Sequence, residues 1–193
     1  MKRIAVFCGS SSGKDEAYLK EAYELGKNLA ARNIELVYGG ADVGLMGAVA
    51  NGAIENNGKA IGVLPNFLKE YEIAHQNLTE LILVDTMHQR KTKMEELADG
   101  VITLPGGIGT LEEFFEMYTW GQLGLHKKPV AILNVNGFYD ELLSFISTMI
   151  NKGFLREIYR QMVLVSDDIN DLLDQMQNYV PPIVGRKIDK TKI

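Results

Sequence analysis

Three glycine-rich turns carry the residue types best suited to holding a phosphate. They span residues 9–13, 39–47 and 106–110, and each follows a short apolar run. Glycine lets backbone amides approach a ligand closely, and a following helix start offers free N–H groups with partial positive charge. Taken singly, each turn can also be simple strand-to-helix geometry. Three of them in one chain predict a phosphate-bearing ligand, and the contact candidates in the first two turns are Ser10, Gly39 and Gly40.

None of the turns matches a standard nucleotide motif. No Gly-Lys-Ser/Thr follows, which excludes a P-loop, and no full G-x-G-x-x-G occurs, so a conventional dinucleotide site is not predicted. The third turn runs into Thr110-Leu111-Glu112-Glu113. Thr110 and Glu113 have the spacing of a capping box, with Thr110 as N-cap and the helix starting near Leu111.

Glu113 also has a second interpretation. On a helical projection it lies nearly opposite Leu111, Phe114 and Tyr118, close to Met117 on a second apolar side. A carboxylate at the edge of such a surface loses water, which raises its pKa and suits proton transfer. Spacing alone favours capping, whereas helical geometry favours a site role, and both stay open.

Arg90 and Lys91 form a third candidate group, one expected strand upstream of the third turn. Arg90 projects between Met94 and Leu97 on the apolar stripe of the segment 87–98. An arginine there can snorkel to solvent, or its fork can bind phosphate or a carboxylate. Its position next to the phosphate-type turn favours the site role.

The sequence predicts no metal centre and no cofactor. His75, His88 and His126 lack metal-ligand spacing and are expected to be packing or surface residues. Cys8, the single cysteine, excludes an internal disulfide and has no recognisable base partner, so it is not expected to be a nucleophile.

Seven apolar runs alternate with helical segments to position these groups. A parallel sheet covered on both faces follows, a doubly wound Rossmann-like α/β fold with ligands beyond the carboxyl ends of the strands. The expected strands are 4–8, 34–38, 60–64, 81–84, 101–104, 130–134 and 162–165. The expected helices are 17–31, 45–56, 87–98, 111–123, 139–151 and 169–177.

The length and net charge of the chain limit the classes of protein to which it can belong. The 193 residues suit one domain over residues 1–180, followed by a flexible tail over 181–193. A net charge of −5 argues against binding a nucleic acid polymer. No apolar run approaches the roughly 20 residues needed to span a bilayer, and a cytoplasmic location is expected.

The chain resembles the Lonely Guy (LOG) family, the cytokinin riboside 5′-monophosphate phosphoribohydrolases, often labelled possible lysine decarboxylases. The paired Met-His-x-Arg-Lys and Pro-Gly-Gly-x-Gly-Thr-x-Glu-Glu motifs are specific together. The resemblance reaches to about residue 155, and it rests on Cys8-Gly9-Ser10-Ser11, Val37-Tyr38-Gly39-Gly40, Gly44-Leu45-Met46-Gly47, Met87-His88-Gln89-Arg90-Lys91, Pro105 to Glu113 and Thr119-Trp120. The chain departs from the pattern at Ala41, where a third glycine is common.

This resemblance implies hydrolysis of a nucleoside 5′-monophosphate, of the cytokinin or adenosine type, to free base and ribose 5-phosphate without a cofactor. It makes Arg90 and Glu113 the catalytic pair and implies a homodimer. It assigns further substrate contacts to Gly107, Ile108, Gly109, Thr110, Lys91, Thr119 and Glu72. Two alternatives remain: a non-catalytic nucleotide or cofactor carrier of the same fold, and a lysine decarboxylase with a pyridoxal phosphate lysine.

Overall fold

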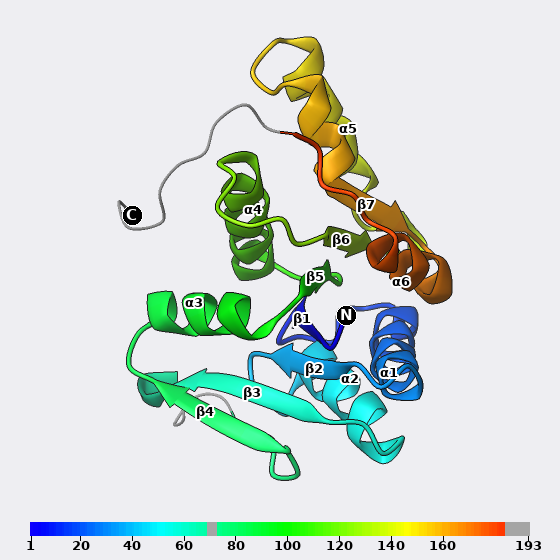
Figure 1. Ribbon diagram of the computed structural model, residues 1–193. Coiled ribbons are helices and arrows are strands. Elements are labelled where there is room, and N and C mark those ends of the chain that lie inside the picture. Colours follow the sequence, from blue (N-terminus) through cyan, green and yellow to red (C-terminus); the bar gives the residue numbers. More distant parts are fainter. Residues whose placement is uncertain (69–72, 184–193) are drawn as a thin grey trace.

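Seven apolar runs of the chain form one parallel sheet, which confirms the predicted fold class (Figure 1). The computed structural model describes residues 1–68 and 73–183. Within this part of the chain the strand order is β4-β3-β2-β1-β5-β6-β7, and neighbouring strands pair in parallel. The strands are β1 (Arg3–Phe7), β2 (Glu35–Tyr38), β3 (Ala60–Pro65), β4 (Glu80–Val84), β5 (Gly100–Thr103), β6 (Val130–Leu133) and β7 (Val163–Ser166).

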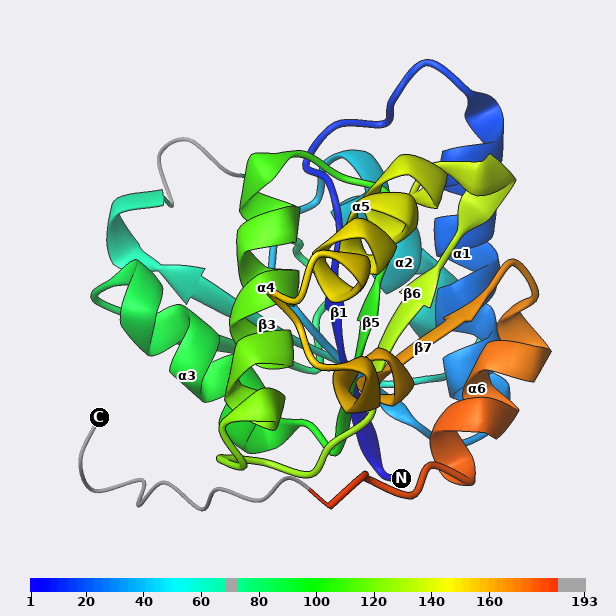
Figure 2. The same cartoon turned by 90° about the horizontal axis from the view of Figure 1, so that it is seen from above.

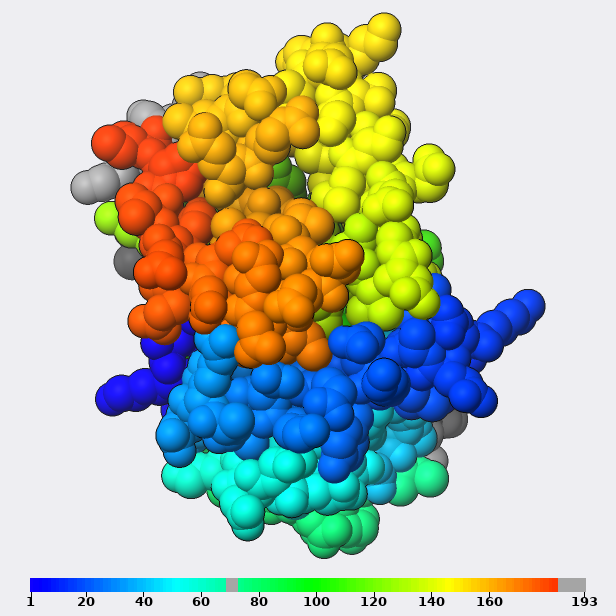
Figure 3. Space-filling view, turned by 90° about the vertical axis from the view of Figure 1, so that its right-hand side faces the viewer, coloured from blue at the N-terminus to red at the C-terminus, as the bar shows by residue number. Residues whose placement is uncertain are grey.

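Helices cover both faces of the sheet. One face carries α1, α2 and α6 and the other α3, α4 and α5 (Figure 1). Figure 3 looks onto α1 and α6, which lie side by side, and Arg32 bridges them with an ion pair of 2.5 Å to Asp174. The helices are α1 (Glu16–Ala31), α2 (Gly44–Glu55), α3 (Met87–Leu97), α4 (Ile108–Gln122), α5 (Asp140–Asn151) and α6 (Ile169–Gln177). Within residues 1–68 and 73–183, three short 3-10 helices span Asn66–Leu68, Val135–Gly137 and Glu157–Met162.

The core divides into two layers along the pleat of the strands. Ile4 and Val6 of β1 pack toward α1, α2 and α6, whereas Ala5 and Phe7 pack toward α3, α4 and α5. All four side chains are buried. A central parallel strand is apolar on both sides because helices cover both faces of its sheet. The loop that follows β1 therefore rises from the middle of the core.

The order of the strands reverses between β1 and β5. β1 to β4 step outward in one direction, and β5 to β7 step outward in the other. At such a switch point the loops after two neighbouring strands part and leave a crevice at the carboxyl edge. Gly9 and Pro105 stand on its two sides, and Gly9 N–H donates a hydrogen bond of 3.0 Å to Pro105 O. Figure 2 shows the loop after β1 and the start of α4 at this edge.

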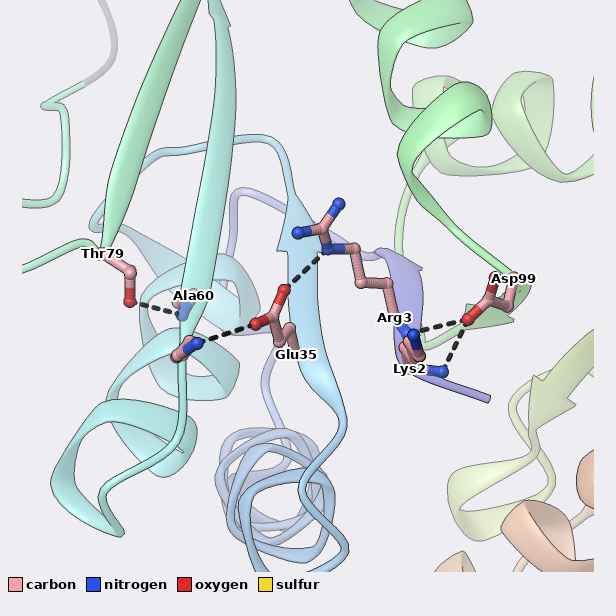
Figure 4. Close-up of polar contacts among 7 residues, drawn as sticks. Lys2, Arg3, Glu35, Ala60, Thr79 and Asp99 are labelled. Atoms are coloured by element: carbon pink, nitrogen blue, oxygen red, sulfur yellow. Dashed lines mark hydrogen bonds and ion pairs between the residues drawn. The ribbon is translucent and has the colours of Figure 1, made fainter.

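At the amino-terminal edge of the sheet, polar contacts join neighbouring strands (Figure 4). Arg3 Nε donates a hydrogen bond of 2.6 Å to Glu35, which links β1 to β2. Asp99 accepts hydrogen bonds from the backbone N–H groups of Lys2 and Arg3 at 2.6 and 3.1 Å. These charged side chains serve the pairing of the strands, and the glycine-rich turns lie at the opposite edge.

The structure corrects the capping box predicted for Thr110 and Glu113. α4 begins at Ile108, and its N-cap is Gly107, which makes no side-chain capping bond. Gly107 is extended (φ −94°, ψ −157°), and its carbonyl accepts a hydrogen bond of 3.1 Å from the N–H of Leu111. Thr110 is therefore already the third helical residue, and Glu113 lies almost a turn further on, free of any capping role.

Some predictions fall partly outside the described residues. Glu72 and residues 184–193 of the predicted tail are among these, and only 181–183 of that tail are described. Over ranges 1–68 and 73–183, the structure contains no helix that is both long and apolar enough to cross a membrane.

Candidate active site

A cavity of about 220 Å³ opens at the crevice between β1 and β5. The end of β1, the turn after β2, one face of α3 and the first turns of α4 form its walls. These segments are far apart in the sequence, and the switch point of the sheet brings them together. The lining includes most of the predicted site residues: Ser10, Gly39, Arg90, Gly107, Gly109, Thr110 and Glu113.

The start of α4 presents a surface suited to an anion. The N–H groups of the first helical residues, Ile108 to Thr110, have no acceptor within the helix, and the helix dipole adds partial positive charge there. A Cβ atom added at Gly107 or Gly109 would meet no atom within 4 Å. The space in front of these two backbone segments is therefore open, and a phosphate can approach their amides closely.

Arg90 reaches the cavity from α3 and is anchored on the second glycine turn. The residue is 6% exposed, and its Nη2 donates a hydrogen bond of 2.9 Å to Gly39 O. Its Nη1 lies 4.0 Å from Met87 Sδ. A Cβ atom at Gly39 would collide with Nη2, so this arrangement requires glycine at that position. The guanidinium turns inward, which rejects the snorkelling alternative.

Glu113 reaches the same cavity from α4 and is half-buried. Burial raises the pKa of its carboxyl to about 7, because the charged form loses water. The positive charge of Arg90 lowers this pKa, and the negative charge of Glu112 raises it further. Both protonation states are therefore populated near neutral pH, which suits a group that binds or transfers a proton.

Cys8 directly follows β1 and is part of the lining of the cavity. Burial raises the pKa of its thiol well above the ordinary value, and the neighbouring Glu113 carboxylate raises it further. A raised pKa favours the protonated thiol, which is a poor nucleophile.

A second cavity of about 280 Å³ adjoins the first and shares Gly9, Ser10 and Gly107 with it. The rings of Tyr18 and Phe138 line it, with their centroids 5.7 Å apart. Small-molecule sites measure roughly 300–1,000 Å³. The two cavities together reach that size. Arg90 and Glu113 make one end of the combined space charged, and Tyr18 and Phe138 make the other end aromatic.

Lys91 is placed differently from the substrate contact expected. It is not part of the lining of either cavity. Its Nζ lies 2.5 Å from Glu112 Oε1 and 3.1 Å from Glu116 Oε2 on α4. Successive residues of a helix point about 100° apart, so Arg90 faces the cavity while Lys91 faces the neighbouring helix.

Three other predicted contacts also lie outside the lining of both cavities. Ile108, the first residue of α4, is 82% exposed. Thr119 is exposed on α4, about 13 Å beyond Thr110 at 1.5 Å per residue. Gly40 has a positive φ of 85° and packs toward Leu81, and its carbonyl accepts a hydrogen bond of 3.0 Å from the N–H of His75. The second turn thus offers Gly39 to the cavity and uses Gly40 for local structure.

Three methionines and Glu112 line the cavity without having been singled out as site residues. The methionines are Met46, Met87 and Met94. The last two flank Arg90 at spacings of three and four, which puts all three residues on one face of α3. This spacing was visible in the sequence as an apolar stripe, but an apolar stripe is also what a core-facing helix shows.

The histidines have structural surroundings, as predicted. His75 Nε2 lies 3.0 Å from Asn51 Oδ1, and His126 Nε2 lies 2.8 Å from Met117 O. His88 is exposed. Among the described residues there is no group of three or more side chains able to hold a metal ion.

Comparison with known proteins gives consistent relationships. A family model described as possible lysine decarboxylase matches residues 46–176. A probable cytokinin riboside 5′-monophosphate phosphoribohydrolase of Oryza sativa subsp. japonica is 48% identical over 181 residues, which cover 93% of this chain and 74% of the rice protein. A cytokinin riboside 5′-monophosphate phosphoribohydrolase of Arabidopsis thaliana is 46% identical over 180 residues, covering 93% and 84% of the two chains.

Solved structures share the fold at lower identity. The molybdenum cofactor carrier protein of Chlamydomonas reinhardtii superposes with a TM-score of 0.71 at 23% identity, over 92% of this chain and 99% of the carrier. The molybdenum cofactor binding protein of Rippkaea orientalis gives a TM-score of 0.69 at 23% identity, covering 91% and 95% of the two chains. At this identity the likeness establishes the fold alone.

Proposed function

This chain belongs to the family of the cytokinin riboside 5′-monophosphate phosphoribohydrolases, and we propose that it hydrolyses the N-glycosidic bond of a nucleoside 5′-monophosphate. Water supplies a hydroxyl group to C1′ of the ribose and a proton to the departing base. The products are the free base and ribose 5-phosphate. The observation that carries the proposal is the meeting of Arg90, Glu113 and the open start of α4 in one cavity.

The start of α4 holds the 5′-phosphate. The backbone amides of Gly107, Gly109 and Thr110 donate to the phosphate oxygens, and the helix dipole favours the negative charge. Fixing the phosphate also fixes the ribose with respect to the cavity, because only a short covalent link separates them. Orientation of this kind can supply a large part of a rate enhancement.

Glu113 acts on the ribose. Breaking the N-glycosidic bond passes through an oxocarbenium-like ribose that carries positive charge. The ionised carboxylate stabilises that charge, and it binds the ribose hydroxyls or orients the attacking water. Its pKa of about 7 leaves it able to accept a proton from that water.

Arg90 positions the substrate and stabilises the departing base. Its Nη2 is fixed on Gly39 O, so the guanidinium is held in one orientation before substrate arrives. A positioned cation beside the base stabilises the negative charge that develops on it during departure.

The alternative lysine decarboxylase chemistry does not suit the lysine beside this cavity. A Schiff base to pyridoxal phosphate requires a neutral amine. Burial by itself lowers the pKa of Lys91, but the ion pairs with Glu112 and Glu116 outweigh it and raise the pKa. Lys91 is therefore held as the charged ammonium.

The test is a hydrolysis panel with free-base detection by chromatography. Adenosine monophosphate and N6-modified analogues should release base and ribose 5-phosphate in equal amounts, and the nucleoside without phosphate should not react. Glu113→Gln and Arg90→Ala should each lower kcat by roughly 100-fold or more with the circular dichroism spectrum unchanged. Glu16→Gln, at an exposed position of α1, is the matched control.

Near wild-type hydrolysis by both site variants would reject the catalytic assignment. Equal turnover of the nucleoside and its monophosphate would reject the phosphate cradle. Binding of the nucleotide without any release of base would instead indicate a carrier.

We further propose that two copies of the chain associate through the open groove between α3 and α4. The groove measures about 570 Å³, and the half-buried Trp120 lines it with Glu96 and Leu125. Trp120→Glu should give a monomer by light scattering. Phe154→Glu, at a residue 89% exposed after α5, should leave the mass unchanged. A monomeric wild-type protein would contradict this assembly.

The cytoplasmic location expected from the sequence stays a prediction. Cell fractionation of the expressing organism tests it directly.

A further inference from the structure

Two ion pairs join α3 to α4 beside the cavity. Lys91 Nζ lies 2.5 Å from Glu112 Oε1 and 3.1 Å from Glu116 Oε2. The side chain of Lys91 is 10% exposed, and that of Glu116 is 22% exposed. The side chain of Glu112 is 54% exposed, so solvent screens its pair with Lys91. The Lys91–Glu116 pair lies further from water, where charges interact more strongly, and removing one partner leaves the other poorly compensated. The cluster therefore links the two helices, mainly through Lys91 and Glu116.

The members of this cluster adjoin the catalytic pair in the sequence. Lys91 follows Arg90 on α3, and Glu112 precedes Glu113 on α4. Glu112 and Glu116 lie one turn apart, so both reach the same side of α4. When Lys91 holds these two carboxylates, the rotation of each helix about its axis is fixed. Arg90 and Glu113 then both face the cavity.

We propose that Lys91 is a positioning residue for the reaction and not a substrate contact. Through Glu112 and Glu116 it holds α4 against α3, and so it sets the place and the electrostatic surroundings of Glu113 relative to Arg90. This inference rests on the proposed function, in which Arg90 and Glu113 are the catalytic pair.

The charges around Glu113 determine the direction of each effect. Positive neighbours lower the pKa of its carboxyl and negative neighbours raise it. Removal of the Lys91 charge leaves two uncompensated carboxylates nearby, so the pKa of Glu113 should rise. Removal of the Glu112 charge should lower it. The groups that interact with Glu113 are Arg90 and Lys91 from α3, Glu112 and Glu116 along α4, and the thiol of Cys8 after β1.

The first experiment measures kcat/KM against pH for adenosine monophosphate hydrolysis. The acidic limb of this profile is the loss of kcat/KM at low pH, where Glu113 becomes protonated. The midpoint of this limb should move to higher pH in Lys91→Met and to lower pH in Glu112→Gln. At a fixed pH below both midpoints, kcat/KM of the variant should be about tenfold lower than that of the wild type for each pH unit by which the midpoint rises. Lys93→Met is the matched control, because Lys93 lies on the same helix in an exposed ion pair of 3.6 Å with Glu96. Its limb should stay at the wild-type pH.

A triple variant separates electrostatics from simple damage. Lys91→Met combined with Glu112→Gln and Glu116→Gln removes the charges and nearly keeps the volumes. Its acidic limb should return toward the wild-type pH, although its kcat stays low because the helices are no longer held together. A direct substrate contact gives a different pattern: KM rises in Lys91→Met with no displacement of the limb, and Glu112→Gln has no effect. That pattern would overturn the proposal.

A second experiment does not depend on turnover. Carbon-13 NMR of glutamate-labelled protein follows the titration of Glu113, whose signal is identified by its loss in Glu113→Gln. The midpoint should rise in Lys91→Met and fall in Glu112→Gln. If the wild type releases no base, the proposed function fails while this titration still tests the cluster. If the wild type is active and both midpoints stay unchanged, the positioning role is refuted.

Discussion

The raised pKa of Glu113 implies that this residue destabilises the folded protein above neutral pH. Replacement by glutamine keeps the shape of the side chain and removes its charge. We therefore expect Glu113→Gln to be more stable than the wild type at pH 8, although it should be nearly inactive. A gain of stability on removal of a catalytic group is the usual consequence of burying a charge for function.

The magnitude follows from the two pKa values. The carboxyl has an ordinary pKa of 4.5 when the chain is unfolded and a pKa of about 7 in the folded protein, with burial as the main cause. The folded state therefore binds the proton more tightly, and stability is lost as pH rises from about 4.5 to about 7. At 1.36 kcal/mol per pH unit the upper limit is roughly 3 kcal/mol. Because Glu113 is only half-buried, we expect ~1–2 kcal/mol at pH 8.

Urea unfolding at constant ionic strength measures this difference. The free energy of unfolding of Glu113→Gln should exceed that of the wild type at pH 8, and the gap should shrink toward zero at pH 5. Glu16→Gln, the same change at an exposed site, should show no such pH dependence. A gap of equal size at both pH values, or a less stable variant at pH 8, would refute the inference that burial raises the pKa of Glu113.

Three further substitutions test separate parts of the structure. Gly109→Ala should add up to about 1 kcal/mol of helix stability, yet lower kcat/KM for adenosine monophosphate roughly 10- to 100-fold by obstructing the amides. Gly121→Ala in the same helix, where the methyl group makes an ordinary contact at 3.4 Å, should add stability without loss of activity, and equal kinetics of the two variants would contradict the cradle. Gly39→Ala should displace the Arg90 guanidinium and lower kcat in steady-state assays, and an unchanged kcat would show that this anchor is dispensable. Thr86→Ala removes the N-cap of α3 and should cost about 1 kcal/mol in urea unfolding, whereas no loss would mean that the cap contributes nothing.

The fold could be predicted because each local signal agreed with the global arrangement. The run around Val101 is apolar on both faces, which is the pattern of a central strand in a covered parallel sheet. Asn33 and Asn57 adopt the positive φ angles with which such residues end helices, at 56° and 61°. These signals depend on residues close in sequence, so they needed no knowledge of the tertiary structure.

The capping box of α3 has the same local sequence pattern, a threonine followed three residues later by a glutamine. Thr86 accepts a hydrogen bond of 3.1 Å from the N–H of Gln89, and the Gln89 side chain accepts one from the N–H of Thr86. The spacing is the one that was assigned to Thr110 and Glu113 at the next helix. Only the first of the two segments places its threonine outside the helix.

The partner of Lys91 could not be derived from local signals. Arg90 and Lys91 are adjacent and chemically similar, so one sequence pattern suits either of them as a site residue. The choice depends on which side of α3 meets α4, and that is fixed by packing across the sheet. Glu112 and Glu116 lie about 20 residues away, and their spacing is shared by many surface pairs.

The residue at which α4 begins explains both why Glu113 makes no capping bond and why the first N–H groups of the helix are open to an anion. Had α4 begun after Thr110, the threonine hydroxyl and the glutamate would have occupied the orphan N–H groups of the first turn. Because the helix begins at Ile108 behind Gly107, a residue with no side chain to offer, those N–H groups stay available to an anion. Glu113 then falls far enough into the helix to face the cavity. The proposed phosphate cradle and the proposed catalytic carboxylate therefore both depend on the same three-residue displacement, and a change at Gly107 that supplies a capping side chain should weaken both functions together.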